Sequence, residues 1–134
     1  MSVSARLTVA AERSAATSAS EWARALGAEL ALNDEQIYRL DLCVTELVTN
    51  VASYAYDDPS GVIELNAHAA PEGGELRVEI IDSGRPFDPL DSERPAPSDF
   101  PLGGHGIGLV RGFADACSYE RRGGQNVFAF TIKR

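Results

Sequence analysis

The sequence is short of cysteine and of basic residues. Its two cysteines, Cys43 and Cys117, lie far apart in the 134 residues and match no metal-binding spacing, so we expect reduced thiols that pack as small apolar side chains. Twelve Lys and Arg residues against twenty Asp and Glu residues give a net charge of −8. This acidic balance argues against nucleic acid or an anionic membrane as the main partner, and it leaves room for a basic protein partner.

Long apolar runs and targeting signals are absent as well. No apolar stretch is long enough to cross a bilayer, and residues 1–7 lack the basic start and apolar middle of a signal peptide. The chain length fits one domain with one core. We therefore expect a single cytoplasmic domain over residues 1–134, without a membrane-spanning segment.

A strongly patterned stretch predicts a central helix. Apolar residues recur there at intervals of three and four, the signature of one buried helical face: Ile37, Leu40, Val44, Leu47, Val48, Val51 and Ala55. Glu46 and Asn50 point away from this face and, being four residues apart, are neighbours on the helix surface. A carboxamide oxygen suits Mg²⁺, and a carboxylate can accept a proton or orient a nucleophile. Because two ordinary surface residues would look the same, the pair needs support from elsewhere.

The rest of the chain predicts strands and further helices. Apolar and polar residues alternate, as they do in strands, over 3–10, 62–69, 75–81, 116–121 and 126–133. We expect the first strand at a sheet edge and hairpins around residues 71–74 and 123–124. Helices are expected over 14–26, ended by Gly27, and over 107–116, with Asn33 or Asp34 capping the central helix.

Two further stretches favour a ligand site. Asp82 follows the 75–81 strand, where its carboxylate can accept a hydrogen bond from an exocyclic amine, and Gly84 lets the backbone approach a flat ligand. The glycine run 103–108 opens a helix and can turn several N–H groups toward an anion. Between them lies a long proline-rich segment, as in a lid or binding loop. Taken singly, each stretch is also compatible with an ordinary turn or hinge.

The order and spacing of the three stretches resemble the GHKL (Bergerat-fold) ATPases, and among them the anti-sigma factor serine/threonine kinases of the RsbW and SpoIIAB type. Glu46-Leu-Val-Thr-Asn50 resembles the N box of that family. Asp82-Ser-Gly84-Arg-Pro-Phe-Asp88-Pro resembles its G1 box, and Gly104-His-Gly106-Ile-Gly108-Leu resembles its G2 box. The likeness extends from the central helix to the C-terminus.

The resemblance implies a role for each motif residue. Asn50 would ligate the Mg²⁺ that bridges the phosphates, and Glu46 would act as the general base or orient the attacking hydroxyl. Asp82 would hold the adenine amine, and Gly84 would make room for the base. Behind an ATP lid over residues 86–104, the nucleotide would also be bound by Gly104, His105, Gly106, Ile107, Gly108 and Leu109.

The resemblance also implies a fold and a function. The fold would be a two-layer α/β sandwich of the α+β class, with a mixed, mostly antiparallel sheet and helices on one face. The protein would be an ATP-dependent serine/threonine kinase and anti-sigma factor that forms a dimer, sequesters a sigma factor and phosphorylates a STAS-domain anti-sigma factor antagonist. Two departures stand out: Tyr54, where many relatives have histidine, and Gln125-Asn126, where relatives commonly have threonine near the nucleotide.

Three other functions fit parts of the pattern. A binding module can use ATP only to set its shape and its choice of partner, but such a module has no need for the carboxylate of Glu46. A histidine kinase is disfavoured because no helix with a phosphoacceptor histidine precedes the motifs. A hydrolase of the gyrase or mismatch-repair type is disfavoured because the sequence lacks the transducer domain that such enzymes need.

Overall fold

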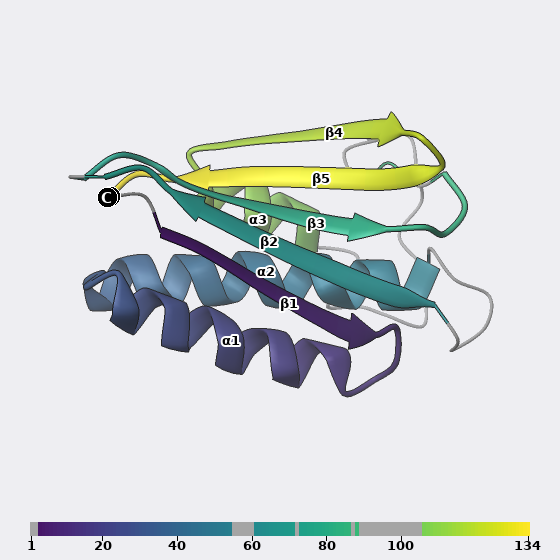
Figure 1. Ribbon diagram of the computed structural model, residues 1–134, viewed down its shortest axis with the longest axis horizontal. Helices are drawn as coiled ribbons and strands as arrows, with labels where there is room; N and C mark the ends of the chain where they lie inside the picture. The colour runs from purple at the N-terminus through teal and green to yellow at the C-terminus, as the bar shows by residue number, and fades with distance from the viewer. Residues whose placement is uncertain (1–2, 55–60, 72, 87, 89–105) are drawn as a thin grey trace.

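One sheet and the helices beside it make up the described structure (Figure 1). The computed structural model describes residues 3–54, 61–71, 73–86, 88 and 106–134. Its strands are β1 (Val3–Ala10), β2 (Val62–Ala69), β3 (Leu76–Asp82), β4 (Ala116–Arg122) and β5 (Gln125–Ile132). The helices of the described residues are α1 (Ala15–Glu29), α2 (Asp34–Tyr54) and α3 (Gly106–Phe113).

The strands pair in the order β1-β2-β3-β5-β4, and every pairing between the described strands is antiparallel. β1 and β2 have the predicted bounds, and β1 lies at the edge of the sheet, as expected. Gly123 and Gly124 join β4 to β5 with φ values of 55° and 79°, the left-handed geometry of a two-residue hairpin turn. This turn fixes which residues of β4 and β5 face each other.

The helices cover one face of the sheet, so the predicted two-layer α+β sandwich is confirmed (Figure 1). Alternate residues of β2 and β3 are buried, and burial of one such large apolar side chain contributes roughly 1.5–3 kcal/mol. Leu40, Val44 and Leu47 of α2 are at most 1% exposed, as the periodicity predicts. Asn33 caps α2: its Oδ1 accepts a hydrogen bond from the backbone N–H of Gln36 at 2.8 Å.

The predicted end of the first helix at Gly27 is wrong. α1 continues to Glu29, and Gly27 is buried within it. A Cβ atom at this position would lie 2.7 Å from Cγ1 of Ile37 on α2. Gly27 therefore allows close contact between two helices. The chain reverses after the helix at Ala31, whose φ of 57° lies in the left-handed region.

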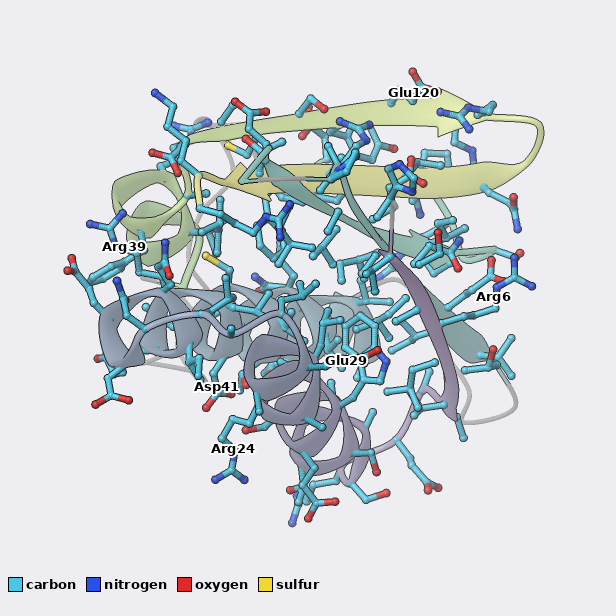
Figure 2. All side chains as sticks on the ribbon, turned by 60° about the vertical axis from the view of Figure 1, so that its left-hand side comes forward. Arg6, Arg24, Glu29, Arg39, Asp41 and Glu120 are labelled. Atoms are coloured by element: carbon cyan, nitrogen blue, oxygen red, sulfur yellow. The ribbon has the colours of Figure 1, made fainter. Side chains whose placement is uncertain are left out.

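The remaining expectations concern the thiols and the outer surface. Cys43 is buried, Cys117 is half-buried, and both are free, as predicted. Burial raises the pKa of Cys43 to about 12. Charged side chains such as Arg6 and Glu120 project from the strands away from the helices (Figure 2). Within the described residues, no helix combines the length and apolar character required to span a membrane.

Candidate functional site

A row of polar side chains crosses the sheet at one end. Asp82, the last residue of β3, pairs with Asn126 of β5, and Asn126 pairs with Arg121 of β4. Asp82 and Asn126 lie two residues from the inward-facing Ile80 and Phe128, so the strand period directs them toward the helix layer. Each is only 3% exposed. The register of the sheet thus assembles a row of polar residues from three strands, which is buried on β3 and β5 and exposed at Arg121 of β4.

The central helix α2 closes this row into a pocket. Four polar residues line it, namely Asn50, Asp82, Tyr119 and Asn126, between apolar walls of Leu47, Val51, Ile80 and Phe128. The hollow has an empty volume of about 280 Å³, including the space at its mouth. Within the described part of the chain, the buried polar side chains are Asn50, Asp82 and Asn126, and all of them line this pocket. Because burying polar groups is costly, their concentration in one place indicates a ligand site.

The structure corrects one expectation about Asn50. Its side chain does not point to solvent: it is 5% exposed and lines the pocket opposite Asp82. Nδ2 of Asn50 is buried and has no hydrogen-bond partner among the described residues. The sheet covers α2 here on a side beyond its apolar face, because residues of β3 and β5 line the pocket together with Asn50. Asn50 and Asp82, far apart in the sequence, are brought together as the motifs predict.

Among the described residues, one carboxylate oxygen of Asp82 accepts all the hydrogen bonds of that side chain. Oδ1 accepts from the backbone N–H of Gly84 at 2.9 Å and from Nδ2 of Asn126 at 2.8 Å. Arg121 donates to the carbonyl of Gly84 at 2.8 Å, which holds the turn after β3. Burial raises the pKa of Asp82, and the hydrogen bonds from Asn126 and Gly84 and the charge of Arg121 oppose that shift. Oδ2 accepts no hydrogen bond from the described residues.

Glu46 lies one helical turn before Asn50 and outside the pocket lining. Its side chain is half-buried, and desolvation raises the pKa of its carboxyl group. A pKa nearer to neutral makes a carboxylate a better proton acceptor in catalysis. The chemistry expected of Glu46 is therefore compatible with its surroundings.

The predicted phosphate-binding segment is only partly described. Gly104 and His105 lie outside the described residues, and so does almost all of the expected lid over 86–104. α3 begins at Gly106, which confirms that the glycine run opens a helix. Ile107, Gly108 and Leu109 belong to the first turn of α3. Farther along, Phe113 meets Tyr38 of α2 edge to face, with ring centroids 5.9 Å apart.

The chemistry of the described residues suits an adenine base and a divalent cation that arrives with its phosphates. The apolar walls suit a flat ring, and Oδ2 of Asp82 offers an acceptor to an amine. Nδ2 of Asn50 lacks a partner among the described residues, and rotating the amide by half a turn would put a metal-binding oxygen in its place. The described residues contain no cluster of three or more His, Cys, Asp or Glu side chains that could hold a metal. A cation here would therefore need ligands from the nucleotide.

Sequence reasoning missed Tyr119 and Arg121 and gave Asn126 no role in the site. Tyr119 and Arg121 share the inward face of β4, and the alternation in 116–121 places them on one side. Their contact with Asn126 and Gly84 depends on strand register and on the turn after β3. The contact of Arg121 with Gly84 is long-range, so no local pattern could reveal it, whereas Tyr119 and Asn126 lie within the hairpin that the sequence predicts.

Residues 8–132 match the histidine kinase-like ATPase domain. The serine/threonine-protein kinase BtrW of Bordetella bronchiseptica is 32% identical over 98 residues, which are 70% of this chain and 68% of that protein. An anti-sigma F factor of Clostridium acetobutylicum is 29% identical over 98 residues, which are 68% of this chain and 65% of that protein.

A solved structure shows the same fold. The RsbU and RsbW domains of a Mycobacterium tuberculosis protein match 98% of this chain and 33% of that chain with a TM-score of 0.73 and 18% identity. A blue-light activated histidine kinase of Erythrobacter litoralis matches 73% of this chain and 30% of that chain, with a TM-score of 0.54 and 29% identity. The chain therefore belongs to the histidine kinase-like ATPases, and within them to the group of anti-sigma factor serine/threonine kinases that its three motifs resemble.

Proposed function

We propose that this protein is an ATP-dependent serine/threonine kinase and anti-sigma factor. It binds Mg·ATP in the pocket between α2 and the sheet, sequesters a sigma factor as a homodimer, and phosphorylates a STAS-domain antagonist. The names of two relatives, one a serine/threonine kinase and one an anti-sigma factor, support the two activities. The observation that carries the proposal is the collection of Asn50, Asp82 and Asn126 in one pocket.

Each site residue has a separate task in this function. Asp82 accepts a hydrogen bond from the base amine through Oδ2, and the amide oxygen of Asn50 is a ligand for the Mg²⁺ that accompanies the phosphates. The bound nucleotide supplies the phosphoryl group. Glu46 takes the proton of the substrate hydroxyl as its oxygen bonds to the γ-phosphorus, and ADP is released with the pair of electrons of the broken bond. We assign the contacts with the phosphates to residues 104–109, as the resemblance of this segment to the G2 box implies.

The test separates chemistry from binding with Glu46→Gln. Loss of a general base slows phosphate transfer by ~10²–10⁴. ATP affinity stays equal or rises slightly, because the variant removes a negative charge near the phosphates. The assay measures transfer of labelled phosphate to a STAS-domain protein that co-purifies with the chain, with calorimetry of ATP binding alongside. Glu35→Gln is the matched control, since the Glu35 side chain on the same helix is 72% exposed and pairs with Arg39.

The variant also predicts the state of the partners. Glu46→Gln should still bind the sigma factor. The antagonist stays unphosphorylated, however, and keeps the variant protein occupied, so the sigma factor remains free whenever antagonist is present. Equal transfer by Glu46→Gln and the unchanged protein would remove Glu46 from catalysis. If the unchanged protein binds ATP and a STAS-domain protein but transfers no phosphate, the chain is a nucleotide-gated binding module instead. Absence of ATP binding would overturn the site itself.

A further inference from the structure

Three hydrogen-bonded side chains form a row along the pocket wall, from β4 through β5 to β3. The hydroxyl of Tyr119 donates to Oδ1 of Asn126 at 2.5 Å. Nδ2 of Asn126 donates to Oδ1 of Asp82 at 2.8 Å and to the carbonyl of Arg85 at 2.8 Å. The contacts of Asn126 with Asp82 and Arg85 link residues 44 and 41 positions apart, while Tyr119 and Asn126 belong to one hairpin. Tyr119, Asn126 and Asp82 line the pocket itself.

The contacts fix the orientation of the Asn126 amide. Its two N–H protons meet two acceptors, the Asp82 carboxylate and the Arg85 carbonyl. A reversed amide would set its oxygen against both of these acceptors and its nitrogen against the hydroxyl of Tyr119. The first change is unfavourable in a buried site because it places three acceptors together, whereas the hydroxyl of Tyr119 can accept as well as donate. Asn126 therefore acts as a fixed donor, and Tyr119 secures the opposite end of the same amide.

The fixed amide in turn orients Asp82. Oδ1 receives the amide of Asn126 on one side and the backbone N–H of Gly84 on the other. Rotation of the carboxylate would break both bonds, so Oδ2 remains the oxygen available to a ligand. We propose that Asn126 and Tyr119 are positioning residues for base recognition: together they hold Asp82 so that Oδ2 accepts the amine of an adenine base and rejects a base with an oxygen in its place.

The proposal rests on the proposed nucleotide site and concerns its selectivity. A fixed carboxylate accepts hydrogen bonds only, so it pairs with the adenine amine and repels the exocyclic oxygen of hypoxanthine. Only a carboxyl group that carries a proton can donate to that oxygen, whereas a carboxylate that is free to rotate no longer directs Oδ2 at the amine. Loss of Asn126 permits both changes, and base preference should then weaken.

Protonation gives the proposal a second consequence. Burial raises the pKa of Asp82, while Asn126, Gly84 and Arg121 lower it. The charged group that lowers the pKa of this carboxyl is Arg121 of β4. The pocket also contains the titratable hydroxyl of Tyr119, and the residues that α2 contributes to the pocket wall are uncharged. Removal of Asn126 therefore raises the pKa of Asp82 further. Adenine binding, which uses the ionised form, should then be lost at a higher pH than in the unchanged protein.

The experiment compares Asn126→Ala and Tyr119→Phe with two matched controls. Gln125→Ala alters the neighbouring exposed residue, which makes only a 3.4 Å contact with Ser83, and Tyr38→Phe removes a hydroxyl from the exposed Tyr38 of α2. Calorimetry measures the affinities for ADP and inosine diphosphate with Mg²⁺ from acid to neutral pH. Carboxyl NMR measures the pKa of Asp82 without nucleotide.

We expect Asn126→Ala to reduce the preference for ADP over inosine diphosphate roughly tenfold. The pKa of Asp82 should rise, and Tyr119→Phe should shift both quantities in the same direction by less. The controls should match the unchanged protein. A general loss of structure would lower the affinities for ADP and inosine diphosphate together and leave their ratio unchanged. The ratio is therefore the decisive quantity.

The possible failures are distinguishable. If the unchanged protein binds ADP and Asn126→Ala keeps both its base preference and its Asp82 pKa, the inference is wrong and the nucleotide site stands. A rise in pKa with an unchanged preference also overturns it, because orientation then has no part in recognition. If the unchanged protein binds no adenine nucleotide, the proposed function fails, and the inference falls with it whatever the NMR titration shows.

Discussion

Two of the hollows beside α2 each contain an aspartate. The groove between α1 and α2 is the larger, with an empty volume of about 750 Å³ against about 280 Å³ for the pocket between α2 and the sheet. Asp41 in the groove accepts from Ser20 at 2.6 Å and from Thr45 at 3.1 Å, and its second oxygen lies 4.0 Å from Arg24. Figure 2 shows Arg24 and Asp41 near each other at the helix surface.

The smaller hollow holds the polar groups that need a ligand. Both oxygens of the half-exposed Asp41 have partners within the protein, whereas Asp82 is buried and only its Oδ1 has partners in the described part of the chain. The buried amide nitrogen of Asn50 likewise has none among the described residues. Size alone would favour the groove, but polar groups buried without complete satisfaction are the better sign of a site. The comparison can be tested by equivalent changes on the two sides of α2.

The largest difference should come from Asn50→Ala against Thr45→Ala. Asn50→Ala removes the side chain that we propose as a ligand for Mg²⁺, so we expect ATP binding in the presence of Mg²⁺ to be lost. Thr45 lines the groove on the same helix, and its loss should leave ATP affinity unchanged. Calorimetry with and without Mg²⁺ measures both. Unchanged Mg²⁺-dependent affinity in Asn50→Ala would remove Asn50 from the site.

The same variant should fold normally, but not because Asn50 is exposed. Its amide is buried and its nitrogen makes no hydrogen bond with the described residues, so truncation breaks no such bond there and costs about 1 kcal/mol or less. Thermal unfolding without nucleotide is the check. A much larger loss would show that Asn50 stabilises the fold, and its effect on ATP binding would then need another explanation.

A smaller difference is expected between Asp82→Asn and Asp41→Asn. Asp82→Asn replaces the acceptor for the base amine by a carboxamide, and loss of a hydrogen bond to a charged group costs about 1.5–3 kcal/mol of binding, roughly tenfold or more in affinity. Asp41→Asn leaves the pocket intact and should bind ADP as the unchanged protein does. Calorimetry of ADP with Mg²⁺ tests both variants. Equal losses in the two would show that the comparison between the hollows is mistaken.

The accuracy of the sequence predictions follows the range of the interactions involved. Local periodicity located β1 and β2 and the apolar face of α2, because the side-chain period of each element is set by its own backbone. The prediction for Gly27 was wrong because a glycine is needed there for close contact with Ile37 on another helix, and not to end the helix. Local signals cannot distinguish a glycine that ends a helix from one that admits a neighbouring helix.

The candidate site divides in the same way. Asp82 and Asn50 belong to recognisable motifs, so the sequence could place them at one site before their geometry was known. The burial of Asn50 and the roles of Tyr119 and Asn126 depend on strand register and on how α2 lies over the sheet. Apart from the contact of Tyr119 with Asn126 within one hairpin, these relations join residues dozens of positions apart, and they appear only when the chain is folded.

The smallest expected effect is on stability without nucleotide, and the two aspartates should differ in sign. Burial raises the pKa of Asp82 in the folded protein, so its ionised form is a cost to folding at neutral pH. That cost disappears as the pH falls through the raised pKa toward the ordinary carboxyl range. Asp82→Asn cannot ionise, and its oxygen can still accept from Gly84 and Asn126, so we expect it to stabilise the protein by about 0.5–2 kcal/mol at neutral pH. The gain should shrink on acidification.

Asp41→Asn should act in the opposite direction. It weakens a partly exposed ion pair with Arg24, whose side chain is 60% exposed, so it should cost less than about 1 kcal/mol at neutral pH. Thermal unfolding of both variants without nucleotide, at neutral and at acid pH, tests the pair. If Asp82→Asn is more stable and binds ADP more weakly, then Asp82 serves ligand binding and lowers the stability of the folded protein. Destabilisation by both variants would mean that Asp82, like Asp41, is held for structural reasons.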